Sequence, residues 1–119
     1  MIDNYTVAVV DDDPAVLDSL RFLLEAAGHR VATYSSAVTF LADCGTPPAC
    51  LILDQHMPQM TGLELAAELH AAGRLTHILL ITASASPAVV TRAAQLGIEK
   101  VLEKPLHEDD LLSFVNAHH

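Results

Sequence analysis

Basic residues are scarce in this chain of 119 residues: 6 lysines and arginines stand against 15 aspartates and glutamates, for a formal net charge of -9. A surface with this charge repels a phosphate backbone, which excludes direct nucleic-acid binding by this domain. Long apolar runs are also missing, since no stretch approaches the roughly 20 residues of a membrane-spanning helix. The first residues, Met1-Ile2-Asp3-Asn4, lack the basic and then apolar order of a signal peptide. We therefore expect a cytoplasmic protein without a membrane partner.

Cysteine is nearly absent, and histidine shows no metal-type spacing. Cys44 and Cys50 match neither a metal motif nor a redox motif, so we interpret them as small apolar residues. The 7 histidines are scattered, and no pair of them has the spacing of a zinc site. His118 and His119 are either native or the remnant of a purification tag. The spacing of these residues therefore predicts neither a disulfide nor a zinc site.

The hydrophobic residues predict one packed core. They make up 51% of the chain, and we expect a single domain over residues 1–119. Short apolar runs without alternation are typical of strands buried on both faces, and such strands are usually parallel. The expected strands lie at residues 5–10, 31–34, 49–53, 78–81 and 100–102.

Amphipathic stretches separate these strands. Apolar residues at helical spacing predict helices at 16–27, 65–72 and 89–94, with shorter helices at 37–41 and 108–115. Asp13-Pro14 and Ser86-Pro87 each place a capping side chain before a proline at the first helical position. Glycines fall where three of the helices should end: Gly28, Gly73 and Gly97.

Strands and helices alternate along the chain, which predicts an α/β, flavodoxin-like (βα)5 fold. This is a doubly wound, five-stranded parallel sheet with helices on both faces. For a chain of this length we expect the strand order 2-1-3-4-5. Strands one and three are then neighbours, and the connections that leave them go to opposite faces. Ligands of such folds bind in the crevice that opens at this point.

Carboxylates follow both of these neighbouring strands. Asp11, Asp12 and Asp13 come directly after the first strand, and Asp54 comes directly after the third. Carboxylates about 4 Å apart repel by roughly 4 kcal/mol at an effective dielectric of 20, so such a group requires a positive partner. A hard divalent cation is the obvious candidate. Because Asp13 precedes a proline, we expect it to cap the following helix rather than to bind a metal.

A hydroxyl and an ammonium reach the same rim, because Thr82 follows the fourth strand and Lys104 the fifth. The segments that carry the pattern are 9–13 (Val-Val-Asp-Asp-Asp), 53–62, which begins Leu-Asp-Gln-His-Met-Pro, 81–83 (Ile-Thr-Ala) and 103–105 (Glu-Lys-Pro). In this order and on these elements, they resemble the receiver domain of two-component response regulators over essentially the whole chain. The Glu-Lys-Pro ending and the short helices are also similar to the nitrogen-fixation-regulator branch of that family.

The resemblance implies a phosphorelay function in which Asp54 accepts a phosphoryl group from a phosphohistidine donor. A carboxylate can form an acyl phosphate, and the transfer requires mainly positioning and charge neutralisation. Lys104 and Thr82 would contact the phosphoryl oxygens. The resemblance assigns Mg²⁺, replaceable by Mn²⁺ or Ca²⁺, to Asp12 and Asp54 directly, to Asp11 through water, and to the backbone carbonyl of His56. The domain would be no enzyme beyond its own phosphorylation and dephosphorylation.

The same residues have simpler explanations. The acids could be solvated loop or turn residues, Thr82 a polar strand end and Lys104 a surface lysine. A receiver that serves only as a protein-interaction module is the main alternative function. A phosphatase of the haloacid dehalogenase type would place a second acid where this chain has His56. A flavodoxin-like nucleotide-binding module would need a phosphate loop rich in Gly, Ser and Thr, and this chain has acids there instead.

Several positions bear on switching. Val101 occupies the place of the family's signalling aromatic, three residues before Lys104, and it cannot swing between inward and outward positions as an aromatic does. His56 and Ser84 lie where family members control the access of water to the acyl phosphate. The family also favours a cis bond before the proline at Pro105.

Partners follow from the resemblance. The phosphodonor would be a sensor histidine kinase or a phosphotransfer protein, docked through the first helix, where Asp18, Arg21 and Glu25 are expected to be exposed. The output face would comprise 86–96 and the last strand and helix, with homodimerisation as one use of it. The chain is either a stand-alone receiver or one whose output domain has been removed.

Overall fold

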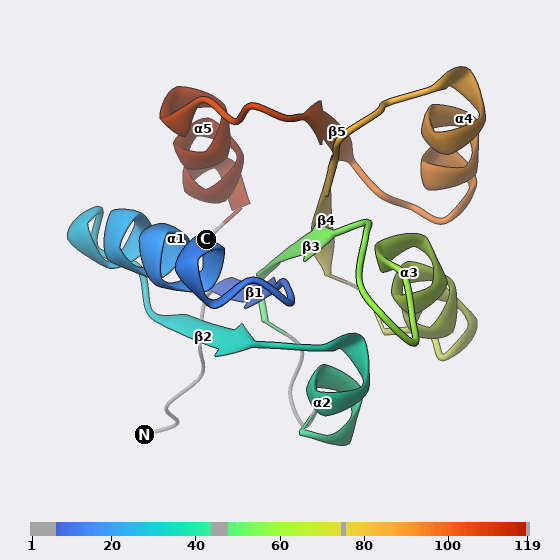
Figure 1. Cartoon of the computed structure of the whole chain (residues 1–119), viewed down its shortest axis with the longest axis horizontal. Coiled ribbons are helices and arrows are strands. Elements are labelled where there is room, and N and C mark those ends of the chain that lie inside the picture. The colour runs from blue at the N-terminus through green and yellow to red at the C-terminus, as the bar shows by residue number, and fades with distance from the viewer. Residues whose placement is uncertain (1–6, 44–47, 75, 119) are drawn as a thin grey trace.

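The computed structural model describes residues 7–43, 48–74 and 76–118 (Figure 1). Strands and helices alternate along these residues, as the sequence predicts. The strands are β1 (Val7–Val10), β2 (Val31–Tyr34), β3 (Cys50–Asp54), β4 (His77–Thr82) and β5 (Lys100–Glu103). The helices are α1 (Pro14–Ala26), α2 (Ala37–Ala42), α3 (Gly62–Ala71), α4 (Pro87–Gln95) and α5 (Glu108–His118).

The strands form one parallel sheet in the order β2-β1-β3-β4-β5, which confirms the expected fold class and strand order. In β1 every residue is buried, and so is every residue of β3. Val10 pairs with Leu53, so the two strands end side by side. The carboxyl ends of β1 and β3 therefore meet at one edge of the sheet.

Helices cover both faces of the sheet and close a core on each side (Figure 1). On one face, Leu24 of α1 and Phe114 of α5 pack with Val9 and Ile52. On the other face, buried residues of α2, α3 and α4 pack with Leu51 and the other inward residues of the sheet. Alternate residues of each strand enter opposite cores, because successive side chains of a strand point to opposite faces. The apolar strand runs of the sequence are explained by this double burial.

Local signals in the sequence set most element boundaries. The Asp13 side chain accepts a hydrogen bond from the backbone N–H of Ala15 at 2.9 Å, so Asp13 caps α1 as expected. The Ser86 hydroxyl accepts from Val89 N at the start of α4. The glycines after three helices all have positive φ, which an L side chain rarely adopts: Gly28 (97°), Gly73 (70°) and Gly97 (79°).

Several predicted boundaries are wrong. Asp54 and Thr82 are the last residues of β3 and β4 rather than the residues after them, because each still pairs with a neighbouring strand: Asp54 with Ile81, and Thr82 with Glu103. α5 continues to His118 rather than ending near Val115, since the apolar period ends before the backbone helix does. Residues 5 and 6 of the first expected strand lie outside the described residues, and so does Cys44. Cys50 is a free, buried thiol, in agreement with its interpretation as a small apolar residue.

A capping box starts α3, and it gives a stability prediction. The Thr61 hydroxyl accepts from Glu64 N at 3.1 Å, and the Glu64 carboxylate accepts from Thr61 N at 2.9 Å. Thr61→Ala removes one of these bonds and is expected to lower the free energy of unfolding by about 1 kcal/mol. Urea denaturation measures the change. Thr91→Ala, on the exposed side of α4, removes the same atoms without a cap and should leave stability unchanged; equal losses in both variants would contradict the prediction.

No helix within the described residues is long and apolar enough to cross a membrane.

Candidate functional site

Three carboxylates gather at the carboxyl ends of β1 and β3. One carboxylate oxygen from each of Asp11, Asp12 and Asp54 lies within 4.8 Å of the others. Asp11 and Asp54 are each 3% exposed, whereas Asp12 faces solvent. Two hydrogen bonds to neighbouring backbone groups fix Asp11. Its backbone N–H donates to Tyr34 O, and its side-chain Oδ1 accepts from Asp13 N at 2.9 Å. The structure thus brings together the acids that the sequence predicted to be neighbours.

Lys104 supplies a positive charge to this cluster. Its Nζ lies 3.1 Å from Asp54 Oδ1, and its side chain is partly exposed. The backbone places it, since Lys104 N donates to Thr82 O at 2.9 Å and so continues the pairing of β4 with β5. The Lys104-Pro105 bond is cis, as the resemblance suggested. One ammonium therefore faces three carboxylates.

The excess of negative charge appears in the pKa values. Burial raises the pKa of Asp11 from 3.8 to about 6; the hydrogen bond from Asp13 opposes this shift, and the charge of Asp54 adds to it. For Lys104, burial lowers the pKa, but the contact with Asp54 and the charges of Asp11 and Asp12 outweigh burial and raise it. The cluster therefore holds Lys104 protonated and makes ionisation of Asp11 costly.

Thr82 lies at the end of β4, on the strand beside Asp54. Its side chain is 1% exposed, and its hydroxyl is engaged by the following loop: it donates to Ser84 O and accepts from Ser84 N, both at 3.2 Å. In this arrangement the hydroxyl binds the β4–α4 loop. The same loop is held from β5, because Ala85 N donates to the Glu103 carboxylate at 2.9 Å.

The segment after Asp54 is fixed by two residues that the sequence interpretation missed. Gln55 accepts from Leu63 N at 2.8 Å through its side chain and from Gly62 N through its backbone, so it joins the end of β3 to the start of α3. A Cβ on Gly62 would lie 2.6 Å from the Asp54 carbonyl oxygen and 2.7 Å from Leu80 Cδ1, so only glycine fits. No spacing or charge pattern marks Gln55, since its role depends on the packing of α3 against β3.

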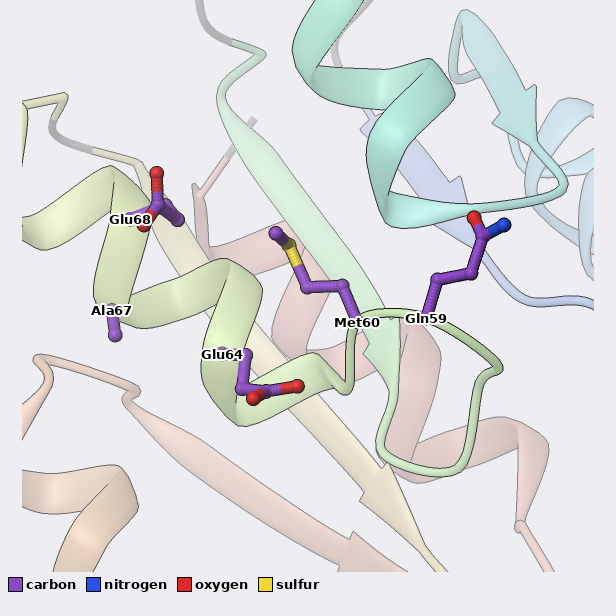
Figure 2. A pocket seen from close by; sticks show the side chains of 5 residues that line it. All are labelled: Gln59, Met60, Glu64, Ala67 and Glu68. Atoms are coloured by element: carbon purple, nitrogen blue, oxygen red, sulfur yellow. The ribbon is translucent and has the colours of Figure 1, made fainter.

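The remaining predicted residues lie around this centre. The His56 side chain is exposed, and so is that of Ser84. Val101 is half-buried and packs on the core under α2, α3 and α4. A shallow pocket of about 240 Å³ beside α3 is lined by Gln59, Met60, Glu64, Ala67 and Glu68 and shares no residue with the acidic cluster (Figure 2).

The acidic cluster fits a hard divalent cation. Asp54 Oδ1 is buried, and no donor among the described residues gives it a hydrogen bond, although Lys104 lies at ion-pair distance. One ammonium cannot neutralise three clustered carboxylates, so the cluster keeps negative charge that a divalent cation would offset. Carboxylate oxygens from two strand ends, with one side open to water at Asp12, are the ligands that Mg²⁺ prefers.

Comparison with known proteins agrees with this geometry. The family model described as response regulator receiver domain matches residues 7–116. The transcriptional regulatory protein FixJ of Azorhizobium caulinodans is 38% identical over 98% of this chain and 56% of its own length. The response regulator protein TmoT of Ectopseudomonas mendocina is 37% identical over 93% of this chain and 51% of its own length. The chain thus spans about half the length of these curated relatives. The match to FixJ agrees with the resemblance to the nitrogen-fixation-regulator branch that the sequence suggested.

Solved structures show the same fold. The response regulator StyR superposes with a TM-score of 0.88 at 38% identity, over 98% of this chain and 59% of that one. A CheY-like receiver domain protein from Methanospirillum hungatei gives a TM-score of 0.88 at 27% identity, over 97% of this chain and 93% of that one. With a family match over nearly the whole chain, the protein belongs to the response regulator receiver domains of two-component signalling.

Proposed function

We propose that this receiver accepts a phosphoryl group from a phosphohistidine donor onto Asp54, with Mg²⁺ bound in the acidic cluster. The single observation that carries the proposal is the placement of Lys104 Nζ 3.1 Å from Asp54 Oδ1, beside Asp11 and Asp12. The donor is a sensor histidine kinase or a phosphotransfer protein. Residues 1–119 act as one domain, whose chemistry is limited to its own phosphorylation and dephosphorylation.

In the proposed reaction an Asp54 carboxylate oxygen attacks phosphorus. The bond between phosphorus and the donor's imidazole nitrogen breaks, and its electron pair leaves with the imidazole. Lys104 neutralises charge on one equatorial phosphoryl oxygen, and burial of Asp54 excludes competing water. Mg²⁺, when bound, would supply further neutralisation of phosphoryl charge. The ligands proposed for Mg²⁺ are Asp12 and Asp54 directly, Asp11 through water, and the His56 backbone carbonyl; Mn²⁺ and Ca²⁺ are expected to substitute.

The proposed switch is the β4–α4 loop. On phosphorylation the Thr82 hydroxyl leaves Ser84 and bonds to a phosphoryl oxygen, which frees the loop before α4. The contact of Ala85 with Glu103 connects the same loop to β5. Since Val101 replaces the family's aromatic, the change is carried by the loop and α4 rather than by rotation of a ring. The output surface is α4, β5 and α5, which an output domain or a second copy of the chain would contact.

The proposed docking surface for the donor is α1, which begins beside the acidic cluster. Asp18, Arg21 and Glu25 are all exposed on it, and Arg21 pairs with Glu25 at 3.5 Å. The net charge of -9 argues against direct nucleic-acid contact by this domain. A cytoplasmic location is proposed because sensor kinases present their phosphohistidine there. Some of the longer relatives are named transcriptional regulatory proteins, which supports control of transcription by the whole protein.

A small-molecule phosphodonor tests the proposal. Acetyl phosphate or phosphoramidate with Mg²⁺ is expected to add one phosphoryl group to the intact protein, as measured by mass spectrometry. Asp54→Ala should carry no adduct, and chelation of Mg²⁺ should prevent the adduct in the unchanged protein. Absence of the adduct with every donor would overturn the proposal in favour of an interaction-only receiver. An adduct that persists in Asp54→Ala would overturn the assignment of Asp54.

His56 gives a prediction about the lifetime of the acyl phosphate. Its exposed side chain follows Asp54 by two residues, at the position where family members control the access of water to the acyl phosphate. His56→Ala is expected to change the first-order decay rate, because an imidazole there orients or excludes the attacking water. Decay is measured by mass spectrometry after removal of the donor. His107→Ala, which removes an exposed imidazole before α5, is the matched control; an unchanged decay rate in His56→Ala would refute the role.

A further inference from the structure

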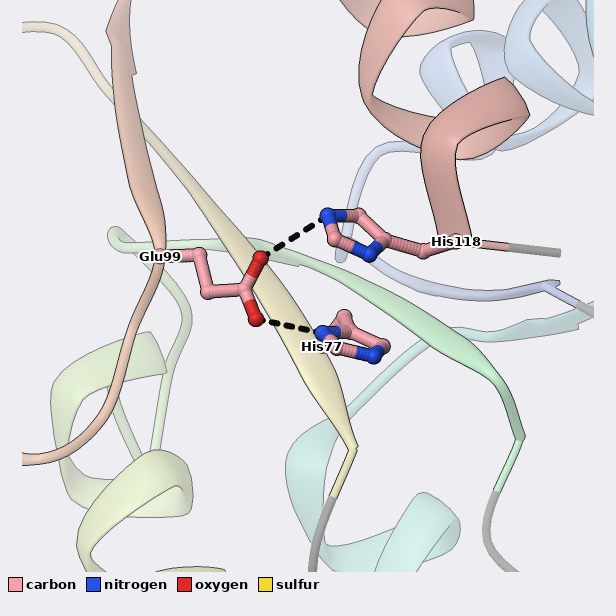
Figure 3. Close-up of side chains that lie close together, drawn as sticks. All are labelled: His77, Glu99 and His118. Atoms are coloured by element: carbon pink, nitrogen blue, oxygen red, sulfur yellow. Dashed lines mark hydrogen bonds and ion pairs between the residues drawn. The ribbon is translucent and has the colours of Figure 1, made fainter.

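A second polar cluster lies at the opposite end of the sheet from Asp54. His77 begins β4, Glu99 directly precedes β5, and His118 ends α5. Figure 3 shows both imidazole rings directed at the two oxygens of the Glu99 carboxylate. Glu99 Oε2 lies 2.8 Å from His118 Nε2, and Oε1 contacts His77 Nδ1. One ligand atom from each residue lies within 4.8 Å of the others. Three separate segments thus bring two imidazoles and one carboxylate together.

The rings are held in place by packing as well as by the carboxylate. The two imidazoles stack with centroids 3.9 Å apart, and Phe114 packs on His118 at 5.0 Å. All three polar side chains remain accessible, at 46% for His77, 40% for Glu99 and 24% for His118. They line an open pocket together with Ala49, Thr76 and Gly97. A solute ion can therefore reach the donors.

The donor types select a class of ion. Two imidazole nitrogens and one carboxylate form the ligand set of open zinc sites, whereas Mg²⁺ and Ca²⁺ prefer oxygen ligands alone. We propose that His77, Glu99 and His118 bind a late first-row divalent transition metal, represented by Zn²⁺, at a site separate from the acidic cluster. Water from the pocket completes the coordination.

Binding requires a small rearrangement. Zinc lies about 2.0–2.2 Å from nitrogen and oxygen ligands, which places two ligands of one tetrahedral ion roughly 3.4 Å apart. The 2.8 Å contact between His118 Nε2 and Glu99 Oε2 must therefore open to admit the ion. A ring nitrogen binds along the ring plane, and the planes are now 18° apart, so one ring must rotate to direct both lone pairs at a shared ion. The ion then takes the place of the contacts between Glu99 and the rings. The end of α5 becomes joined to β4 and to the residue before β5.

The sequence does not reveal this cluster, because its members are far apart in the chain. His77 and Glu99 are 22 residues apart in the sequence. His118 lies at the end of the last helix, α5. No pair of histidines has the sequence spacing of a zinc motif. That criterion does not apply to this cluster, because the fold brings its residues together from distant parts of the chain. The acidic cluster is a competing cation site, so a test must saturate it.

Calorimetric titration with Zn²⁺ in excess Mg²⁺ tests the proposal. The unchanged protein is expected to bind one Zn²⁺ per chain. His77→Gln, Glu99→Gln and His118→Gln should each weaken binding beyond the 10–100-fold that loss of an outer hydrogen-bond partner costs. His107→Gln should bind Zn²⁺ as the unchanged protein does. Zn²⁺ should also raise the thermal unfolding midpoint of the unchanged protein but not that of Glu99→Gln.

Three results would overturn the site. Zinc binding that survives in Glu99→Gln and His77→Gln would mean that these residues are not ligands. Loss of binding in His119→Gln with retention in His77→Gln would assign the ion to the end of the chain alone. Loss of binding in Asp12→Asn would assign it to the acidic cluster. Circular dichroism of each variant establishes that the fold is intact, and imidazole chemical shifts of His77 and His118 report their coordination directly.

Discussion

Lys104→Gln is expected to slow phosphorylation of Asp54 by about 10²–10³-fold, the usual cost of losing one donor that stabilises transition-state charge. Lys104 Nζ lies 3.1 Å from Asp54 Oδ1 and is the one ammonium that faces the cluster among the described residues. Glutamine retains a polar side chain of similar reach but removes the charge. The rate of adduct formation from phosphoramidate, followed by mass spectrometry at fixed Mg²⁺, measures the effect.

Metal affinity separates this role from loss of structure. The proposed Mg²⁺ would neutralise the same carboxylates as Lys104 does, so Lys104→Gln should bind Mg²⁺ more tightly while reacting more slowly. An unfolded variant would lose both properties. Lys100→Gln removes the same charge from the exposed start of β5 and should leave both rate and affinity unchanged. A rate for Lys104→Gln equal to that of Lys100→Gln would show that the ion pair has no part in the transfer.

The sequence predicts the elements of this domain well because each is marked locally. Double burial makes the central strands continuous apolar runs, and prolines and capping side chains mark where α1 and α4 begin. The meeting of Asp11 with Asp54 is also predictable, since parallel strands with the expected order end at one edge. Prediction at this level needs topology alone.

Features that depend on side-chain direction were not predictable. The bond of Glu103 to Ala85 N and the anchoring of α3 by Gln55 each join segments whose spacing follows no period. The hydroxyl of Thr82 faces Ser84 here, which the position of Thr82 at a strand end does not determine. The cluster of His77, Glu99 and His118 needs three separate segments to converge at the far edge of the sheet. These contacts form only when separate elements pack together, and the spacing of residues along the sequence does not determine that packing.

Asp11→Asn is expected to stabilise the protein at neutral pH when no divalent ion is present. Burial raises the pKa of Asp11 from 3.8 to about 6, so between these values the folded protein binds more protons than the unfolded chain. Stability therefore falls as pH rises from 3.8 to 6, and above 6 the ionised carboxylate costs its full amount. A shift of about two pKa units corresponds to at most roughly 3 kcal/mol. Asparagine keeps an oxygen that can accept from Asp13 N and carries no charge.

The signature of this effect is its dependence on pH and on Mg²⁺. Denaturant unfolding in a chelator should show Asp11→Asn more stable than the unchanged protein at pH 7.5, with the difference vanishing near pH 4, where Asp11 is protonated. Saturating Mg²⁺ should reduce the difference at pH 7.5, because the ion stabilises the ionised cluster of the unchanged protein more than that of the variant. Asp18→Asn makes the same charge change on the exposed face of α1 and should show neither dependence. A difference independent of pH would mean that Asp11 carries no electrostatic strain, and the acidic cluster would then be stable without the cation proposed to bind there.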